Sequence, residues 1–162
     1  MSRSVILLLL MTSTSMQIAS AQDSKKEKEA AETKSIIYSK NFVFTPQSAT
    51  PTGGKLLPLT GEFHLIITED TVISYLPYYG RAYSPPVSSN SGGITFTSTD
   101  YQYSIAEEKK GGWEILIQPK DVKDVDKLSL TVFENGNASL QVMSRSRQPI
   151  SYRGYISANK SK

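Results

Sequence analysis

Residues 113–142, WEILIQPKDVKDVDKLSLTVFENGNASLQV, carry the pattern that decides the fold. Apolar residues alternate with polar ones in three runs, which are Trp113/Ile115/Ile117, Leu128/Leu130/Val132 and Ala138/Leu140/Val142. A period of two predicts β-strands with one buried face, because successive side chains of a strand point to opposite sides. Between the last two runs, the dipeptide Asn135-Gly136 predicts a tight type I′ hairpin turn.

Similar runs extend on both sides of this stretch. We expect further strands over residues 41–45, 56–59, 62–68, 71–76, 93–98, 101–105 and 150–156, with a turn-rich connection over 47–55. Consecutive runs are expected to pair as hairpins, and a long meander removes its exposed edges by closing on itself. The prediction is an all-β fold with a short N-terminal helix, an antiparallel meander closing into a small lipocalin-like barrel. An open β-sandwich is the alternative.

Residues 1–21 have the three parts of a secretory signal peptide. Arg3 supplies the positive charge, Val5–Met11 the apolar run, and Ala19-Ser20-Ala21 the small-residue cleavage site. The run is much shorter than the ~20 residues that cross a bilayer, so we expect no transmembrane segment. We predict cleavage following Ala21 and secretion across the inner membrane to the periplasm or cell surface. A buried or disordered N-terminal helix is the alternative.

The mature chain divides into three parts. Residues 22–38 are rich in Lys, Glu and Ala and predict a polar helix or arm whose last turn, Ile36–Tyr38, packs on the domain. Residues 39–158 form a single β domain, and residues 159–162 are expected to be a disordered tail.

Composition excludes several classes of protein. The 162 residues include no cysteine, so disulfides, thiolate metal sites and a cysteine nucleophile are excluded. A net charge of +3 is too small to indicate nucleic acid as a partner. The one histidine, His64, is expected to face solvent, opposite a face formed by Phe63, Leu65 and Ile67, and it lacks a second imidazole for a metal site.

No recognisable catalytic motif is present, so we expect no catalytic residues, no metal and no cofactor, and the chain is not expected to be an enzyme. Acidic residues in turns leave a carboxylate-based hydrolase as a less favoured reading. The spacing of Asp121, Asp124 and Asp126 is only a weak match to a calcium site.

Tyrosine and arginine gather in two stretches, residues 74–93 and 145–155. Tyrosine offers an apolar face and a hydroxyl, and arginine offers a planar fork of donors, so both suit contact surfaces. We predict that the two stretches touch, and that the ligand-binding residues are Tyr78, Tyr79, Arg81, Tyr83, Arg147 and Tyr152. The alternative is structural: Tyr-Arg stacking and turn residues would lock the loop onto the barrel.

The same residues carry a resemblance. SKNFVF at 39–44, LPYYGRAY at 76–83, GGI-x-F at 92–96 and RQPISYRG at 147–154 together resemble the domain of unknown function 4251 family, over residues 30–156. The resemblance implies a small secreted β-barrel-like domain with a short N-terminal helix, found mostly in Bacteroidetes. It implies no activity and no catalytic residues.

The leading hypothesis is a secreted, non-enzymatic binding module with a Tyr/Arg-rich loop surface. Its partner is expected to be a small amphiphile, a glycan fragment or an envelope protein. A structural or protein-interaction component of the bacterial envelope is the second hypothesis. The sequence leaves the oligomeric state open.

Overall fold

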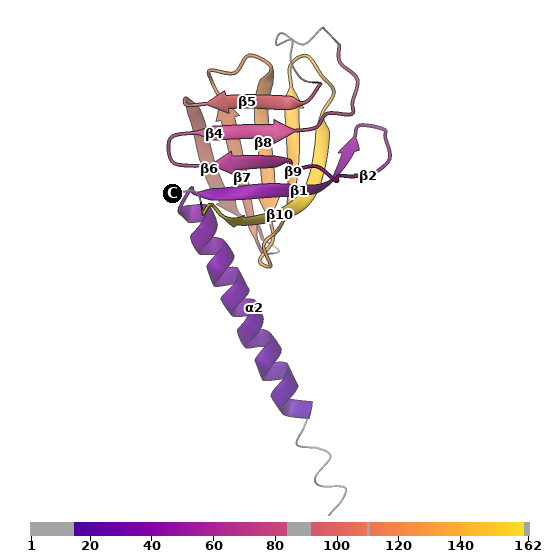
Figure 1. Cartoon of the computed structure of the whole chain (residues 1–162). Helices are drawn as coiled ribbons and strands as arrows, with labels where there is room; N and C mark the ends of the chain where they lie inside the picture. Colours follow the sequence, from indigo (N-terminus) through magenta and orange to yellow (C-terminus); the bar gives the residue numbers. More distant parts are fainter. Residues whose placement is uncertain (1–14, 84–91, 110, 161–162) are drawn as a thin grey trace, which may run out of the picture.

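The computed structural model describes residues 15–83, 92–109 and 111–160 (Figure 1). One helix, α2 (Ser15–Tyr38), precedes the strands. The strands are β1 (Phe42–Pro51), β2 (Leu57–Pro58), β3 (His64–Ile67), β4 (Val72–Leu76), β5 (Ile94–Ser98), β6 (Tyr101–Glu107), β7 (Trp113–Pro119), β8 (Val125–Val132), β9 (Asn137–Ser144) and β10 (Ile150–Ala158). The apolar run Val5–Met11 of the predicted signal peptide lies outside the described residues.

All strands belong to one antiparallel sheet, in the order β5-β4-β3-β1-β10-β9-β8-β7-β6, with β2 paired to β1. Figure 1 shows β5, β4, β3 and β1 crossing in front of β6 to β9, while β10 curves from one layer into the other. The sheet therefore nearly closes into a barrel, and the predicted all-β fold with an N-terminal helix is confirmed.

Not all of the strands pair with their neighbours in sequence, as they would in a full meander. Strands β3 to β5 and β6 to β10 pair in sequence order, but β1 lies between β3 and β10. Among the described residues no ladder joins β5 to β6, although only Thr99 and Asp100 separate them. In the part of the chain that the structure describes, β5 and β6 are therefore the two end strands of this order.

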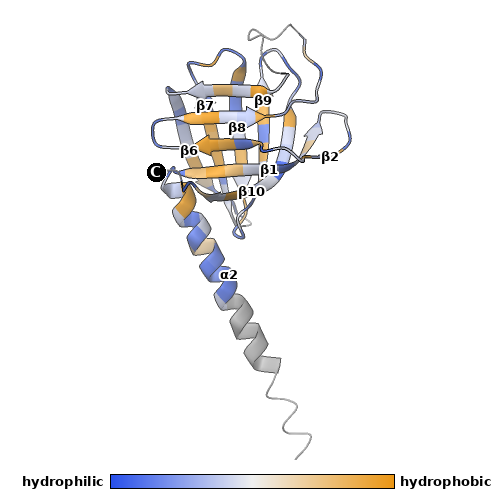
Figure 2. Cartoon of the chain, viewed as in Figure 1, coloured by the Kyte–Doolittle hydropathy of each residue, from blue (hydrophilic) through white to orange (hydrophobic). Residues whose placement is uncertain are grey.

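Inward side chains from both layers pack into one core, including Phe42, Leu65, Ile115, Leu130 and Leu140, all fully buried. This burial supplies the main favourable term in folding. Figure 2 shows the apolar colour concentrated on the strands, whereas most of the coloured part of α2 is hydrophilic.

The helix contacts the barrel through its C-terminal part. Ile37 is fully buried, and its carbonyl accepts a hydrogen bond of 3.0 Å from the hydroxyl of Tyr103. The Thr33 hydroxyl donates to the carbonyl of Glu134 at 3.1 Å. The helix begins at Ser15, before the predicted start of the polar segment, and Tyr38 remains half exposed instead of packing.

Three local expectations were wrong. β1 continues through the predicted turn-rich segment to Pro51, because an irregularity between Pro46 and Ser48 lets the strand bend and keep pairing with β10.

The β8–β9 hairpin lies where expected, but its loop is a three-residue one. Gly136 alone adopts positive φ, 79°, and Gly136 N–H donates to the Phe133 carbonyl. This is the geometry of a type I turn followed by a left-handed glycine.

The third error concerns Phe63, which lies just before β3. Phe63 does not share the inward face of Leu65 and Ile67, since it precedes β3 and its ring stacks on Tyr75. Asn159, expected in a disordered tail, pairs with Asn41: its side-chain amide donates to Asn41 Oδ1 at 3.0 Å, which continues the β1–β10 contact by one residue.

Candidate functional site: a Tyr/Arg lock and an apolar outer face

The loop that follows β4 contacts the β9–β10 connection directly. Ala82 and Arg147 form an antiparallel bridge, with Tyr83 N–H donating to the Ser146 carbonyl at 2.7 Å and Gln148 N–H to the Arg81 carbonyl at 3.0 Å. The two Tyr/Arg stretches of the sequence are therefore neighbours in space, as the sequence analysis predicted.

Arg147 is the centre of this contact and is almost completely buried. Its Nη1 donates to the Gly93 carbonyl at 2.9 Å. Its Nε lies 3.2 Å from Oδ2 of Asp124, an ion-pair distance, but without the alignment of a hydrogen bond. The guanidinium also stacks over the Tyr78 ring, with Cζ 5.2 Å from the centroid. One side chain thus joins three segments of the chain.

Two tyrosine hydroxyls complete the contact. Tyr78 Oη lies 2.8 Å from the Arg81 carbonyl and 3.0 Å from the Gln148 carbonyl, and its single proton is shared between them. Tyr152 is fully buried and donates to the Pro77 carbonyl at 2.6 Å. Burial raises the pKa of both phenols, so both remain protonated donors at neutral pH. We call Tyr78, Arg147, Asp124 and Tyr152 the Tyr/Arg lock.

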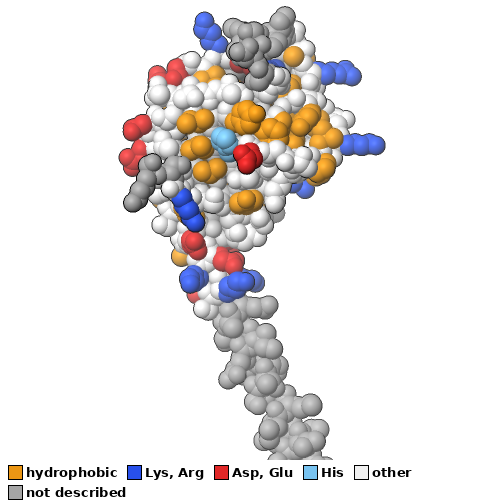
Figure 3. Space-filling view, in the orientation of Figure 1, with side chains coloured by type: hydrophobic (Ala, Val, Ile, Leu, Met, Phe, Trp, Pro, Cys, Tyr) orange, Lys and Arg blue, Asp and Glu red, His pale blue; other side chains and the backbone are white. Residues whose placement is uncertain are grey.

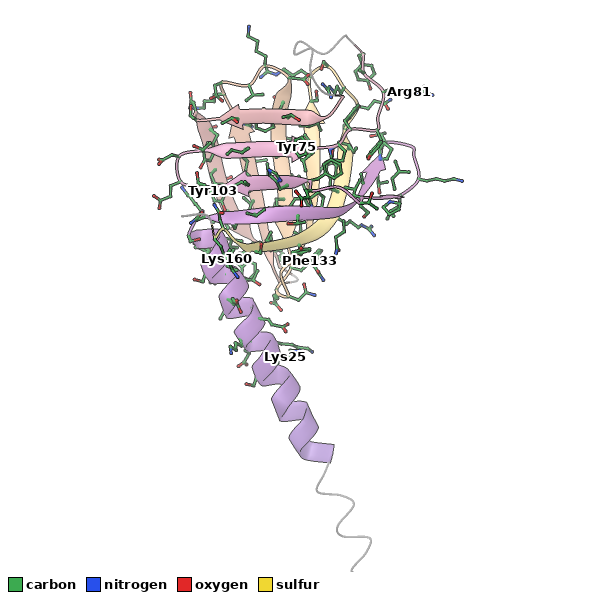
Figure 4. The ribbon with its side chains drawn as sticks, viewed as in Figure 1. Lys25, Tyr75, Arg81, Tyr103, Phe133 and Lys160 are labelled. Carbon is green, nitrogen blue, oxygen red and sulfur yellow. The ribbon has the colours of Figure 1, made fainter. Side chains whose placement is uncertain are left out.

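The other three predicted site residues are not part of the lock. Tyr79, Arg81 and Tyr83 are all exposed, Tyr79 at 48% and Tyr83 at 69%. Figure 4 shows Arg81 at the outer edge of the barrel, beyond the end of β4. The six residues thus divide into three that hold the loop and three that are available to a partner.

A second feature, which the sequence analysis did not single out, lies on the outside of the front layer. Register places Val43, Ile66 and Ile73 side by side across β1, β3 and β4, and their partly exposed side chains alternate with inward ones. In the next row, the Tyr75 ring packs against Phe63 and His64, each with 5.8 Å between centroids. We call Val43, Phe63, His64, Ile66, Ile73 and Tyr75 the apolar outer face.

Outward positions elsewhere on the barrel are different. On β8 and β9 most of them are polar, among them Ser129, Thr131, Ser139 and Gln141, and Met143 is an apolar exception. Figure 3 shows hydrophobic side chains gathered around the histidine and continuing toward the side that carries β2. A contiguous apolar patch on the outside of a barrel is typical of a contact surface. The sequence signal was present: HLII at 64–67 and VISYL at 72–76 are apolar on both faces.

A sequence model of the domain of unknown function DUF4251 matches residues 24–156 of this chain. The chain belongs to the DUF4251 family. A search of curated proteins gave no match. The crystal structure of a DUF4251 family protein from Bacteroides eggerthii DSM 20697 has a similar fold, with a TM-score of 0.59, 10% sequence identity, and coverage of 80% of this chain and 87% of that chain. This likeness extends to the fold alone.

In this DUF4251 domain, the three clustered aspartates have separate protein partners. Asp121 accepts hydrogen bonds from the Ser98 hydroxyl and the Thr99 amide, and the Ser98 bond is the main cause of its lowered pKa. Asp124 accepts from the Ser144 and Ser146 hydroxyls, and Asp126 pairs with Arg145 at 3.8 Å. Within the described part of the chain, no group of acidic or histidine residues is arranged to hold a metal ion.

In the residues for which the structure gives a description, no helix is both long and apolar enough to cross a bilayer.

Proposed function

We propose that this DUF4251 domain is a secreted, non-enzymatic binding module of the periplasm or cell surface. Its contact surface is the apolar outer face, with the loop residues Tyr79, Arg81 and Tyr83 adding polar contacts. The observation that carries the proposal is the contrast between this face and the polar outer face of β8 and β9. Apolar area removed from water contributes about 25 cal/mol per Å², so covering such a face favours association.

The shape of the face favours a protein as the partner. A small amphiphile needs a concave site that surrounds most of its surface, whereas Val43, Ile66 and Ile73 lie across neighbouring strands on the outside of the barrel. This aliphatic centre offers no hydrogen-bonding groups to a glycan, and such groups lie only at its border, on residues such as His64 and Tyr75. Exposed tyrosine and arginine beside an apolar centre are typical of protein interfaces. The inward side chains pack together in one core, so we place no ligand inside the barrel.

The proposal that the domain is not an enzyme is supported by two acidic side chains that already have hydrogen-bond partners within the protein. Asp121 and Asp124, which line the same hollow, each accept hydrogen bonds from neighbouring groups. The lowered pKa of Asp121 disfavours a role as general acid at neutral pH. Export is supported by the sequence of residues 1–21.

Site-specific photocrosslinking in the native host tests the contact surface. The photoreactive residue p-benzoylphenylalanine replaces Tyr75 on the apolar outer face, or Gln141 on the polar face of β9 as the matched control. We expect one discrete adduct from position 75 and none from position 141. Adding Ile73→Asp, an outward substitution, should abolish the adduct while the circular dichroism spectrum is unchanged. Equal adducts from both positions, or none from position 75, would contradict the proposed surface.

A further inference from the structure

A hollow of about 460 Å³ lies on the outside of the barrel, where β8, β9, β10 and β1 run side by side. Four of the side chains that line it are exposed and the fifth is partly buried. The five are Gln47, Phe133, Asn137, Ser139 and Arg153. The hollow contains no residue of the apolar outer face or of the Tyr/Arg lock.

Phe133 forms one wall and is a large apolar side chain left 48% exposed. Figure 4 shows it at the end of the barrel that carries α2. The hairpin holds its main chain in place, since Phe133 N–H donates to the Asn137 carbonyl at 2.8 Å and Gly136 N–H donates to the Phe133 carbonyl at 2.9 Å. The face of an aromatic ring is negatively polarised, so it attracts the C–H groups on the face of a sugar ring.

Gln47 and Arg153 line the hollow on the side of β1 and β10. The register of these two strands passes over Gln47, the extra residue at the irregularity in β1. An extra residue of this kind re-aims a side chain of the strand. The Gln47 carbonyl accepts a hydrogen bond of 2.9 Å from Leu59 N–H. The polar side chains on this side are therefore carried by paired main chain, as a binding site requires.

Arg153 brings an unpaired positive charge to the hollow. It is exposed, and within the described ranges it has no ion-pair partner. Its partners in register, Ser139 and Ser48, are uncharged, whereas Arg145 and Arg147 each pair with an aspartate. A guanidinium binds a carboxylate or sulfate through two parallel N–H bonds. The lining thus has a net charge of +1 and is complementary to an anion.

The uncharged polar side chains favour a ligand with many hydroxyl groups. Gln47, Asn137 and Ser139 together offer donors and acceptors, and in the described part of the chain their side chains have no hydrogen-bond partner. Phe133 is the one large apolar side chain among the lining residues. A protein partner is usually held by several apolar anchors in pockets, so this lining suits a sugar chain better than a peptide.

We propose that this hollow binds an acidic oligosaccharide. One sugar ring stacks on Phe133, a carboxylate or sulfate of the sugar chain pairs with Arg153, and hydroxyl groups bond to the polar side chains between them. The distance from β8 to β1 is three strand spacings, about 14 Å, so the site takes more than one linked sugar. Because it lies apart from the apolar outer face, either site can fail without affecting the other.

A glycan array of neutral, uronate-containing and sulfated oligosaccharides, probed with the folded full chain, tests the ligand class. We expect acidic glycans alone to be retained, and the uronate and sulfate members show which anion is preferred. Each glycan that binds is then titrated beside its neutral counterpart, the methyl ester of a uronate or the desulfated form of a sulfated glycan. The neutral form should bind about tenfold more weakly or worse.

Variants place the binding in the hollow. Arg153→Gln should weaken binding of the acidic glycan about tenfold or more, and Phe133→Ala about fivefold, whereas Phe133→Tyr keeps the ring and should bind as the wild type does. Lys120→Gln removes one exposed positive charge outside the hollow and is the matched control. Circular dichroism verifies that all four variants fold.

A polyglutamate peptide separates recognition of a sugar from attraction of any anion. We expect it to bind at least tenfold more weakly than the acidic glycan, because it cannot stack a sugar ring on Phe133. The proposal is overturned if no acidic glycan is retained, or if the neutral counterpart or polyglutamate binds equally well. Unchanged binding by Arg153→Gln or by Phe133→Ala would also overturn it.

Discussion

The guanidinium of Arg147 stacks on the ring of Tyr78, with 5.2 Å between Cζ and the ring centroid, and the Tyr78 hydroxyl is 3.0 Å from the carbonyl of Gln148, the next residue after Arg147. The same two segments are thus joined by a stacking contact and by a hydrogen bond. The two Tyr/Arg stretches therefore serve mainly to hold the loop after β4 against the β9–β10 connection. Only their exposed residues remain available to contact a partner.

Removing the buried side chain of Arg147 should lower the stability of the domain far more than removing the exposed side chain of Arg81. Arg147→Ala leaves Asp124 without its buried cation and frees the Gly93 carbonyl, which we expect to lower the free energy of unfolding by about 3 kcal/mol. Arg81→Ala, on an exposed side chain, should change it by less than about 0.5 kcal/mol. Urea denaturation followed by tryptophan fluorescence measures both. Similar losses in the two variants would contradict the lock.

Gly154 is expected to tolerate no side chain. A Cβ there would overlap the Thr45 carbonyl and lie 2.8 Å from the Cα of Pro46, both in the backbone of β1. Because backbone cannot move aside without breaking the β1–β10 ladder, Gly154→Ala should destabilise by on the order of 3 kcal/mol or more. Gly92→Ala is the control, since no atom of the described residues lies within 4 Å of its Cβ position. Thermal unfolding of the two variants should differ clearly, and equal melting temperatures would refute the close-contact argument.

Asp121 should contribute to the pH dependence of stability. Its pKa is lowered by the Ser98 hydroxyl first and by backbone amides next, so the folded state favours the carboxylate. The stabilisation is present above the unfolded pKa of about 3.9 and is lost as pH falls through the lower folded value. Asp121→Asn should therefore be less stable than the wild type at pH 7, and the two should converge in acid.

Ser98→Ala removes the main donor to Asp121 and should reproduce part of this behaviour. Urea midpoints from pH 7 to pH 3 provide the measurement. A constant difference between wild type and Asp121→Asn over the whole range would show that the carboxylate charge is not the cause.

If the protein is exported as proposed, the signal peptide should be removed from its N-terminus. Cleavage following Ala21 would leave Gln22 as the first residue, as mass spectrometry of the exported protein can determine. Ala21→Arg places a large charged residue at the cleavage site and should block processing. Ala30→Arg, on the polar helix, should have no effect. Recovery of the intact N-terminus from exported wild-type protein would contradict the signal-peptide prediction.

Alternation in the sequence was sufficient to predict the strands, because nearly every inward position on β7, β8 and β9 is apolar and the period is clear. It could not predict that β1 lies between β3 and β10, since that pairing depends on distant residues. The Tyr/Arg contact was foreseen from composition alone, but burial divided its members: Tyr152 is inside and Tyr83 outside. The apolar outer face was missed because a strand that is apolar on both faces is also typical of a buried strand.

The pairing of β1 with β10 also affects when the molecule can fold. This ladder runs from Phe42 opposite Ala158 to Pro51 opposite Ile150, so it joins the beginning of the domain to its end. Pairing across such a separation needs both segments and carries a loop-closure cost that local hairpins do not. A chain truncated before Ile150 would leave β1 and β9 as open edges prone to aggregation. The pairing of β1 on this side therefore waits until β10 has been synthesised.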